Sequence, residues 1–207
     1  MATITDIQKQ RRRETRYSVY LDGRYAFGLT DLELSTSGLR VGQSLSAADV
    51  AEFEKQAGQT KAYGLGVRYV AIRPRSRLDV AEYLKRRGYS GEAVVVVLER
   101  LGQLGLVDDQ AFAAAWIANR QAIRPRSRRA LAQELAAKGV ARTDIESALG
   151  QQVGPEAEAA AAARIVAKKR HLPQYADAQK LTGYLLRQGF SYEAAQAALE
   201  AAENLGA

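Results

Sequence analysis

The feature that most constrains the fold of this chain is an internal repeat with a period of about 50 residues. The segment Arg73-Pro-Arg-Ser-Arg77 returns unchanged as Arg124-Pro-Arg-Ser-Arg128, 51 positions further on. The positions that follow keep one register in these two copies and in a third copy that lacks the arginine segment: Val80, Leu84 and Gly88; Leu131, Leu135 and Gly139; Leu181, Leu185 and Gly189. A period of this length predicts a tandem array of similar small units.

The pattern within each repeat is typical of three short helices. In the first repeat, Val80 and Leu84 are one helical turn apart, Gly88 can adopt the positive φ that ends a helix, and Ser90 can cap the next one. In the second repeat we expect the first helix to begin after Asp108 and Asp109, whose carboxylates suit a helix N-terminus. That helix is expected to turn four residues inward: Phe112, Ala115, Trp116 and Ile117.

The first 30 residues follow a different pattern, because apolar and polar side chains alternate with the period of a β-strand. Asp22-Gly23 lies between two such runs and favours a type I′ turn, so we expect a hairpin over residues 17–29. Further on, Ser46 and Asp49 have the spacing of a capping box, which predicts a helix that runs to Lys55 or beyond.

These patterns predict a mainly α protein. We expect tandem three-helix repeats in an elongated, curved array, because a unit of about 50 residues buries little surface alone and must pack on its neighbours. A small N-terminal unit that contains the β-hairpin precedes them. The predicted divisions are residues 1–60 for the N-terminal unit and 61–107, 108–154 and 155–207 for the three repeats.

The composition narrows the class of function. The chain carries 30 Lys and Arg against 23 Asp and Glu, a net charge of +7, which favours acidic partners such as nucleic acid or an anionic protein surface. It has no Cys and a single His, so disulfides and thiolate metal sites are excluded. No secretory signal or membrane-spanning run is apparent, and we expect a folded cytoplasmic protein.

Clusters of basic residues are the candidate binding sites. One alternative is that they are ordinary solvated surface, but the arginine segment recurs at the same junction before a helix, where Pro and Ser fix its position. The residues predicted to bind a partner or DNA are Arg73, Arg75, Arg77, Lys85, Arg86, Arg87, Arg120, Arg124, Arg126, Arg128 and Arg129. A further basic run, at Lys9, Arg11, Arg12, Arg13 and Arg16, lies in the hairpin region.

The basic cluster of the second repeat is expected to be unbalanced, because no acidic residue lies between Arg120 and Arg129. Its like charges would repel one another in the free protein, and an anionic partner would relieve that repulsion. Lys168, Lys169 and Arg170 lie in the third repeat, outside any arginine segment, so we expect them to contribute less.

The sequence offers no set of catalytic or cofactor-binding residues. Asp108 and Asp109 could hold a metal, but adjacent carboxylates at a helix start more often cap its amides. His171 has no identifiable partner for proton transfer, and the glycines at 64 and 66 lack the spacing of a nucleotide loop. Tyr17, Tyr25 and Tyr69 each follow an arginine, which suits either base stacking or packing. We expect neither an enzyme nor a bound cofactor.

Three stretches together resemble the RecX family of bacterial RecA regulators over essentially the whole chain. They are the hairpin Tyr20-Leu-Asp-Gly-Arg-Tyr-Ala-Phe-Gly28; the segment 73–77 with Tyr83-Leu84 and Gly88-Tyr89; and Leu104-Gly-Leu-Val-Asp-Asp109 with Phe112, Ala113 and Trp116. The resemblance implies three-helix units of helix-turn-helix type. It also implies binding to RecA and to its filament on single-stranded DNA, with inhibition of ATPase, strand exchange and coprotease activities.

The main rival hypothesis is a helix-turn-helix transcription regulator, since both classes share basic helical units. Preference for one duplex sequence would distinguish the rival from a filament regulator. If the resemblance holds, we expect a monomer that follows the filament through several modest contacts and binds nucleic acid weakly.

Overall fold

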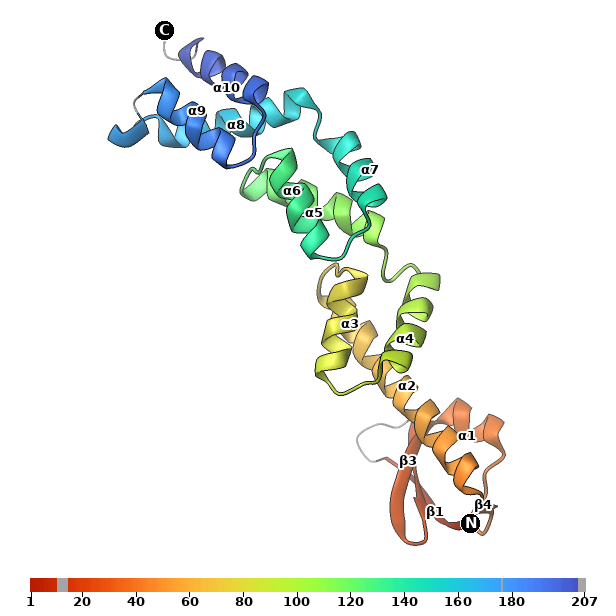
Figure 1. Cartoon of the computed structure of the whole chain (residues 1–207). Coiled ribbons are helices and arrows are strands. Elements are labelled where there is room, and N and C mark those ends of the chain that lie inside the picture. Colours follow the sequence, from red (N-terminus) through yellow and green to blue (C-terminus); the bar gives the residue numbers. More distant parts are fainter. Residues whose placement is uncertain (11–14, 176, 205–207) are drawn as a thin grey trace. The chain divides into compact units, whose positions relative to one another are not determined.

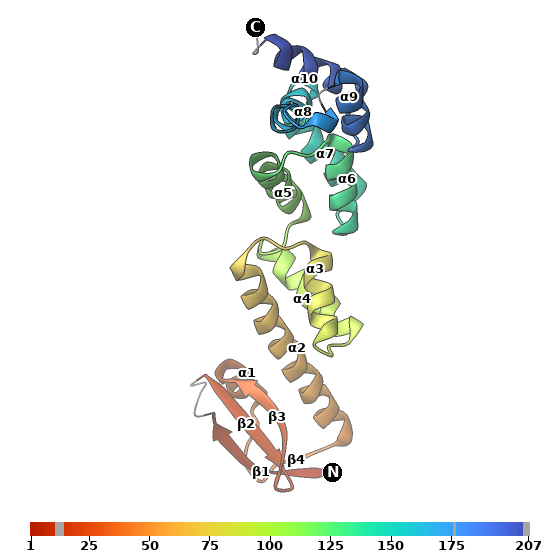
Figure 2. The same ribbon diagram turned by 90° about the vertical axis from the view of Figure 1, so that its left-hand side faces the viewer.

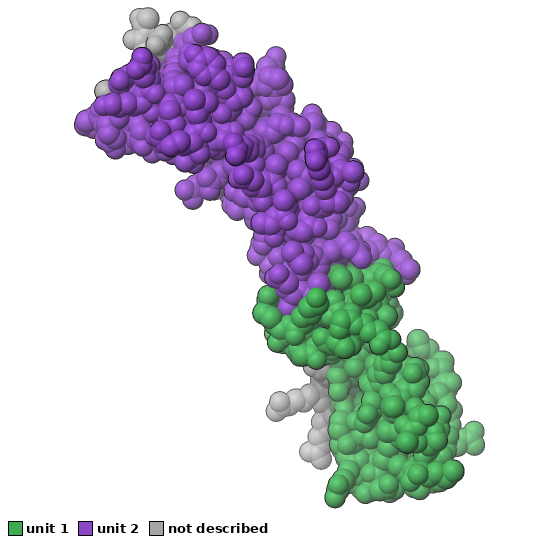
Figure 3. All heavy atoms as spheres, viewed as in Figure 1, with its two compact units in different colours: residues 1–68, 83–101 green, residues 69–82, 102–207 purple. Residues whose placement is uncertain are grey.

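A computed structural model describes residues 1–10, 15–175 and 177–204 (Figure 1). The chain divides into two compact units, which Figure 3 colours separately: Met1–Arg68 with Tyr83–Leu101, and Tyr69–Glu82 with Gly102–Ala207. We call them unit 1 and unit 2. As predicted, the fold is mainly helical and begins with a small antiparallel sheet.

The sheet of unit 1 has four antiparallel strands in the order β3-β2-β1-β4 (Figure 2). Their bounds are Ala2–Lys9 for β1, Arg16–Leu21 for β2, Arg24–Thr30 for β3 and Ser44–Leu45 for β4. The predicted hairpin is confirmed: Tyr17 pairs with Leu29, and the turn residues Asp22 and Gly23 have φ of 47° and 78°. Positive φ at both central residues is the geometry of a type I′ turn.

One face of this sheet packs on two helices, α1 (Asp31–Ser37) and the first half of α2 (Ala47–Ile72). Phe27 of β3 stacks on Phe53 of α2 with ring centroids 5.3 Å apart. Helix α1 was not predicted, although Thr30 and Glu33 form a capping box at its start. The same signal at Ser46 and Asp49 correctly predicted the start of α2.

Helix α2 continues well past Lys55. It is 26 residues long and runs without a break through residue 60. The sequence analysis placed the division between the N-terminal unit and the first repeat at that residue, and this division stays a prediction. Its second half serves as the first helix of repeat one, because Gly66 lies against Val97 and Leu101. A Cβ at Gly66 would lie 3.1 Å from Leu101 Cδ1, so a larger residue here would require the Leu101 side chain to shift by a few tenths of an ångström.

The helices of the three repeats follow the predicted plan. Their bounds are Arg77–Arg86 for α3 and Gly91–Gln103 for α4; Asp109–Ile123, Arg128–Ala137 and Arg142–Gln152 for α5, α6 and α7; Pro155–Lys169, Ala178–Arg187 and Tyr192–Asn204 for α8, α9 and α10. A short 3-10 turn, Pro173–Tyr175, follows α8. Gly88, Gly139 and Gly189 all have positive φ after the middle helices. Leu84, Leu135 and Leu185 are 0% exposed, as the register predicted.

One detail of the predicted core is wrong. On α5, Phe112, Ala113 and Ile117 are buried and Trp116 is half-buried, but Ala115 is exposed. At about 100° per residue, Phe112, Trp116, Ala113 and Ile117 span an arc of about 140° around the helix, and Ala115 lies about 60° outside that arc.

Candidate partner-binding groove

The repeated arginine segment has a structural role at two of its positions. Ser76 and Ser127 are fully buried, and their hydroxyl groups accept hydrogen bonds from the amides of Asp79 and Ala130, each at 3.1 Å. These contacts cap α3 and α6, as predicted.

The last arginine of each segment joins one repeat to the next. Within unit 2, the amide of Arg77 donates to Asp109 Oδ1 at 2.8 Å, and the amide of Arg128 donates to Glu158 Oε1 at 3.0 Å. The acceptor in both cases lies in the first helix of the following repeat. Burial raises the pKa of Asp109 above its ordinary value, against the opposing effect of the Arg77 amide. Asp108 caps α5, as expected. Asp109 was expected to cap the same helix, but it caps the start of α3 instead.

The guanidinium of Arg128 is also used inside the protein. One of its nitrogens donates to the carbonyls of Leu149 and Val153, at 2.9 and 3.0 Å, and so satisfies the C-terminal end of α7. The same joint includes a bond from the Ser127 hydroxyl to the Gln188 carbonyl at 2.8 Å. Arg128 therefore holds repeats two and three together, a role that the sequence did not indicate.

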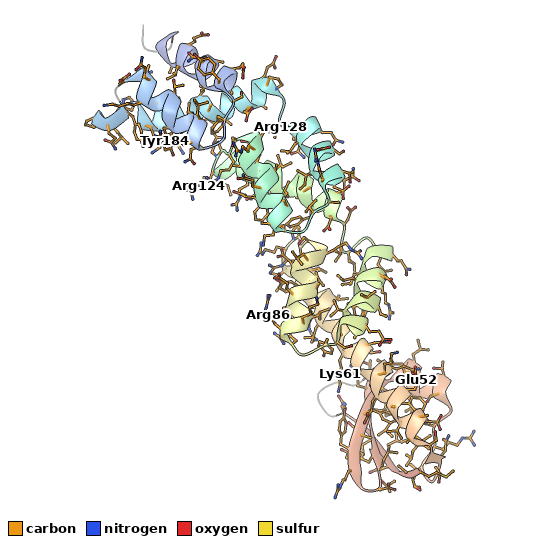
Figure 4. The ribbon with its side chains drawn as sticks, in the orientation of Figure 1. Glu52, Lys61, Arg86, Arg124, Arg128 and Tyr184 are labelled. Carbon is orange, nitrogen blue, oxygen red and sulfur yellow. The ribbon has the colours of Figure 1, made fainter. Side chains whose placement is uncertain are left out.

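A groove in unit 2 brings several basic residues together, and we call it the basic groove. It has a volume of about 280 Å³ and lies between the α5–α6 connection and helices α8 and α9. Figure 4 labels Arg124, from the first side, and Tyr184, from the second. All of the charged residues that line the groove are cations: Arg124, Arg126, Arg164, Lys168 and Lys169.

The groove combines residues that the sequence analysis kept apart. Lys168 and Lys169 were expected to contribute less than the arginine segment because they belong to the third repeat, yet they line the same groove as Arg124 and Arg126. The ammonium of Lys169 lies 4.7 Å from the ring centroid of Tyr184 and 5.0 Å from that of Tyr175. Cation–π contacts of this kind hold the lysine in place beside the groove.

Arg164 is a groove residue that the sequence analysis missed. Its guanidinium donates to the carbonyls of Gln121 and Ala122, at 2.6 and 3.0 Å, and thereby ties α8 to the end of α5. Arg170, beside the two lysines in sequence, instead donates to the carbonyl of Ala202 at 2.6 Å.

The expectation of an unbalanced arginine cluster is wrong, because Glu134 of α6 reaches into it. Its carboxylate lies 2.7 Å from Arg120 Nε and 3.4 Å from Arg126 Nε, and it accepts a bond from Trp116 Nε1 at 2.9 Å. The guanidinium of Arg120 also lies over the Trp116 ring. Glu134 follows Arg126 by eight positions and Arg120 by fourteen, and the packing of α6 on α5 brings it beside both arginines. The balancing acid therefore lies outside the basic run in sequence.

The other predicted binding residues are spread over several places. Arg129 lines another, mainly apolar cavity of about 670 Å³ in unit 2. Arg73 is exposed, and Arg75 stacks on Tyr69 with 4.0 Å between the guanidinium carbon and the ring centroid.

The basic run of unit 1 lies at the end of α3, where Figure 4 labels Arg86. Lys85, Arg86 and Arg87 are all exposed, and Arg87 stands 4.9 Å from the Tyr83 ring centroid. In the sheet, Arg16 donates to the Gly28 carbonyl at 3.2 Å and Lys9 is exposed. Arg11, Arg12 and Arg13 lie outside the described residues.

The described residues show no group of three or more His, Asp and Glu side chains that could hold a metal ion. His171 is exposed on the connection that follows α8. Among the described helices, none is both long enough and apolar enough to cross a membrane.

Comparison with protein families gives three consecutive matches. Residues 2–46 match the family described as "Regulatory protein RecX N-terminal domain", residues 62–101 match "RecX, first three-helix domain", and residues 108–149 match "RecX, second three-helix domain".

Individual relatives extend the likeness beyond those domains. A "Regulatory protein RecX" of Bacillus licheniformis is 30% identical over 97% of this chain and 77% of its own length. Another, of Limosilactobacillus reuteri, is 31% identical over 92% of this chain and 73% of its own length. This chain thus spans about three quarters of each relative.

Solved structures share the fold. One titled "Crystal structure of regulatory protein RecX" has a TM-score of 0.77 at 30% identity, covering 95% of this chain and 98% of that one. A RecX structure from Lactobacillus salivarius has a TM-score of 0.59 at 19% identity, covering 69% of this chain and 95% of its own, and supports the fold alone.

Proposed function

Because this chain belongs to the RecX family of regulatory proteins, we propose that it binds RecA and the RecA filament on single-stranded DNA. Binding would restrain the ATPase, strand-exchange and coprotease activities of the filament. The observation that carries the proposal is the basic groove, where five cationic side chains meet without a carboxylate among the lining residues.

The groove suits a partner that presents phosphates or carboxylates. Guanidinium groups bind either kind of oxyanion through paired hydrogen bonds, and ammonium groups act as point charges. A nucleoprotein filament offers both kinds of anion along its length. Each contact in such a groove is modest, so the affinity would come from several linked contacts made together.

We propose that direct contact with DNA is weak and independent of sequence. The groove residues are cations that suit the phosphate backbone, which supplies affinity but carries no sequence information. Tyr184 and Tyr175 pack edge to face with ring centroids 5.2 Å apart, and Lys169 lies over both rings, so both tyrosines are engaged in internal packing. We also propose that the chain acts as a monomer.

The geometry of the helices disfavours the rival role of a sequence-reading transcription regulator. In helix-turn-helix proteins the N-terminal turn of the recognition helix enters the major groove of DNA. Here the last helix of each repeat has an acidic residue in its first turn: Glu92 in α4, Asp144 in α7 and Glu193 in α10. At that position in the major groove, carboxylates would lie in the negative potential of the two phosphate backbones, which disfavours binding.

The proposal is tested by ATP hydrolysis of RecA on single-stranded DNA. The wild-type chain should slow hydrolysis, and a triple variant of the groove, Arg124→Ala with Lys168→Ala and Lys169→Ala, should lose most of that inhibition. The matched control replaces three exposed arginines that do not line the groove, Arg24, Arg40 and Arg142, and removes the same charge. Failure of the wild-type chain to alter hydrolysis would contradict the proposed function.

A further inference from the structure

The identity between the first two repeats is concentrated in one segment. Residues 71–77 and 122–128 are identical, Ala-Ile-Arg-Pro-Arg-Ser-Arg in both. In the twelve positions that follow, the two repeats match only where Ala81, Leu84 and Gly88 correspond to Ala132, Leu135 and Gly139. The two repeats are therefore much more alike in these seven residues than in the helix that follows them.

The internal contacts account for only part of this segment. The serines cap helices, the last arginines join repeats, and the prolines end the preceding helices. The middle arginines are half-buried, Arg75 against Tyr69 and Arg126 beside Glu134. These roles explain the second half of the segment and leave its beginning without an internal role.

The unexplained positions are an isoleucine and the arginine after it. Ile72 is 77% exposed and Ile123 is 70% exposed, each at the end of the first helix of its repeat. Arg73 and Arg124 are exposed too, and within the described part of the chain neither guanidinium makes a hydrogen bond or an ion pair. A single exposed isoleucine is unremarkable, but the same exposed pair occurs twice at equivalent places in unit 2.

The chemistry of the pair separates two classes of partner. An arginine at a helix C-terminus gains some stability from the helix dipole, and it can bind phosphate or carboxylate equally well. A branched aliphatic side chain gains nothing from phosphates but gains substantially from burial in an apolar socket. The pair together therefore fits a protein surface better than a nucleic-acid backbone.

We propose that Ile72 with Arg73, and Ile123 with Arg124, are two equivalent anchors for a protein surface that repeats along the partner. Each isoleucine fills an apolar socket, and each arginine pairs with a carboxylate at the rim of that socket. This inference rests on the proposed function, because a filament of identical subunits presents the same socket more than once. The third repeat has Leu172-Pro173 without a preceding isoleucine–arginine pair and supplies no third anchor.

The test compares binding to filament with binding to DNA alone. Ile72→Ser, Ile123→Ser and the double variant are titrated onto RecA filaments assembled on single-stranded DNA with a non-hydrolysable ATP analogue, and onto the same DNA without RecA. Each single change should weaken binding to the filament by about tenfold, from the loss of one buried aliphatic group. The double change should weaken it by about a hundredfold, since separate sites add in free energy.

Affinity for DNA alone should not change in any of these variants. The control is Leu32→Ser on α1, where the leucine is 72% exposed and a comparable apolar surface is removed. If both isoleucine variants bind the filament as tightly as the wild-type chain does, the proposed anchors are wrong and the proposed function still stands. An equal loss on DNA alone would also overturn them, because the contact would then be with nucleic acid. If the wild-type chain does not bind the filament, the proposed function and the anchors both fail.

Discussion

Glu158 of α8 accepts a hydrogen bond from the amide of Arg128 at the start of α6, 3.0 Å away, although only 9% of its surface is exposed. The bond crosses from the third repeat to the second. Burying a carboxylate lowers stability unless its oxygens are hydrogen-bonded. This bond caps α6 and also offsets the desolvation of Glu158. Asp109 makes the matching bond to Arg77.

Replacing Glu158 by Ala should therefore weaken the joint between the repeats. We expect a loss of about 1–3 kcal/mol in the free energy of unfolding, because the amide of Arg128 is left without its acceptor. Glu158→Gln keeps an acceptor oxygen and should lose less. Urea denaturation of the two variants measures the difference, and equal stability of Glu158→Ala and the wild-type chain would show that the joint does not depend on this bond.

The central leucine of each repeat should dominate the stability of its own core. Leu135 is fully buried among apolar residues of α5, α6 and α7, and its replacement by Ala should cost about 2–5 kcal/mol. Leu186→Ala, at a leucine that is 42% exposed on α9, is the control and should cost much less. An unchanged denaturation midpoint for Leu135→Ala would contradict the placement of this core.

The capping box of α1 should make the stability of unit 1 depend on pH. Burial opposes ionisation of Glu33, but hydrogen bonds from Thr30 and Thr60 and the charge of Arg16 outweigh it and lower the pKa of Glu33. A carboxyl whose pKa is lower in the folded state stabilises the fold above its ordinary pKa, and that contribution is lost as the pH falls through the folded pKa.

Glu33→Gln removes this contribution. At neutral pH the variant should be less stable than the wild-type chain by up to about 1 kcal/mol, because glutamine can still complete the capping box but lacks the charge that interacts with Arg16 and with the N-terminus of α1. The gap should narrow as the pH falls below the ordinary pKa of glutamate, because protonation removes the same charge from the wild-type chain. Denaturation at pH 7 and at pH 3 measures the gap; a gap that does not change would argue against an ionised Glu33.

Local signals predicted most of the fold. The Asp22-Gly23 turn, the Ser46 cap and the glycines after each middle helix act within a few residues, so the sequence pattern is enough to locate them. Thr30 and Glu33 have the spacing of a capping box, which is an equally local pattern and could have predicted the start of helix α1. The continuation of α2 through residue 60 depends on packing along its whole length, which no short pattern reports.

The groove could not be predicted in the same way. Lys168 and Arg124 are 44 positions apart, and they share a groove only because α8 packs beside the end of α5, where Arg164 closes the contact. The acids that meet the arginines, Glu134 and Glu158, are likewise placed by helix packing and not by nearness in sequence. The sequence shows where the basic residues are, but it does not show which of them pair with other groups of the same protein.

The most direct measurement of the central claim is the salt dependence of binding to the RecA filament. For the groove variant Arg124→Ala, Lys168→Ala and Lys169→Ala, we expect affinity to fall by at least about tenfold and the slope of log affinity against log salt to flatten by about 2, since up to three ionic contacts are lost. The control variant of Arg24, Arg40 and Arg142 should keep both the affinity and the slope nearly unchanged. Equal losses in the two variants, or none in either, would contradict a defined binding groove.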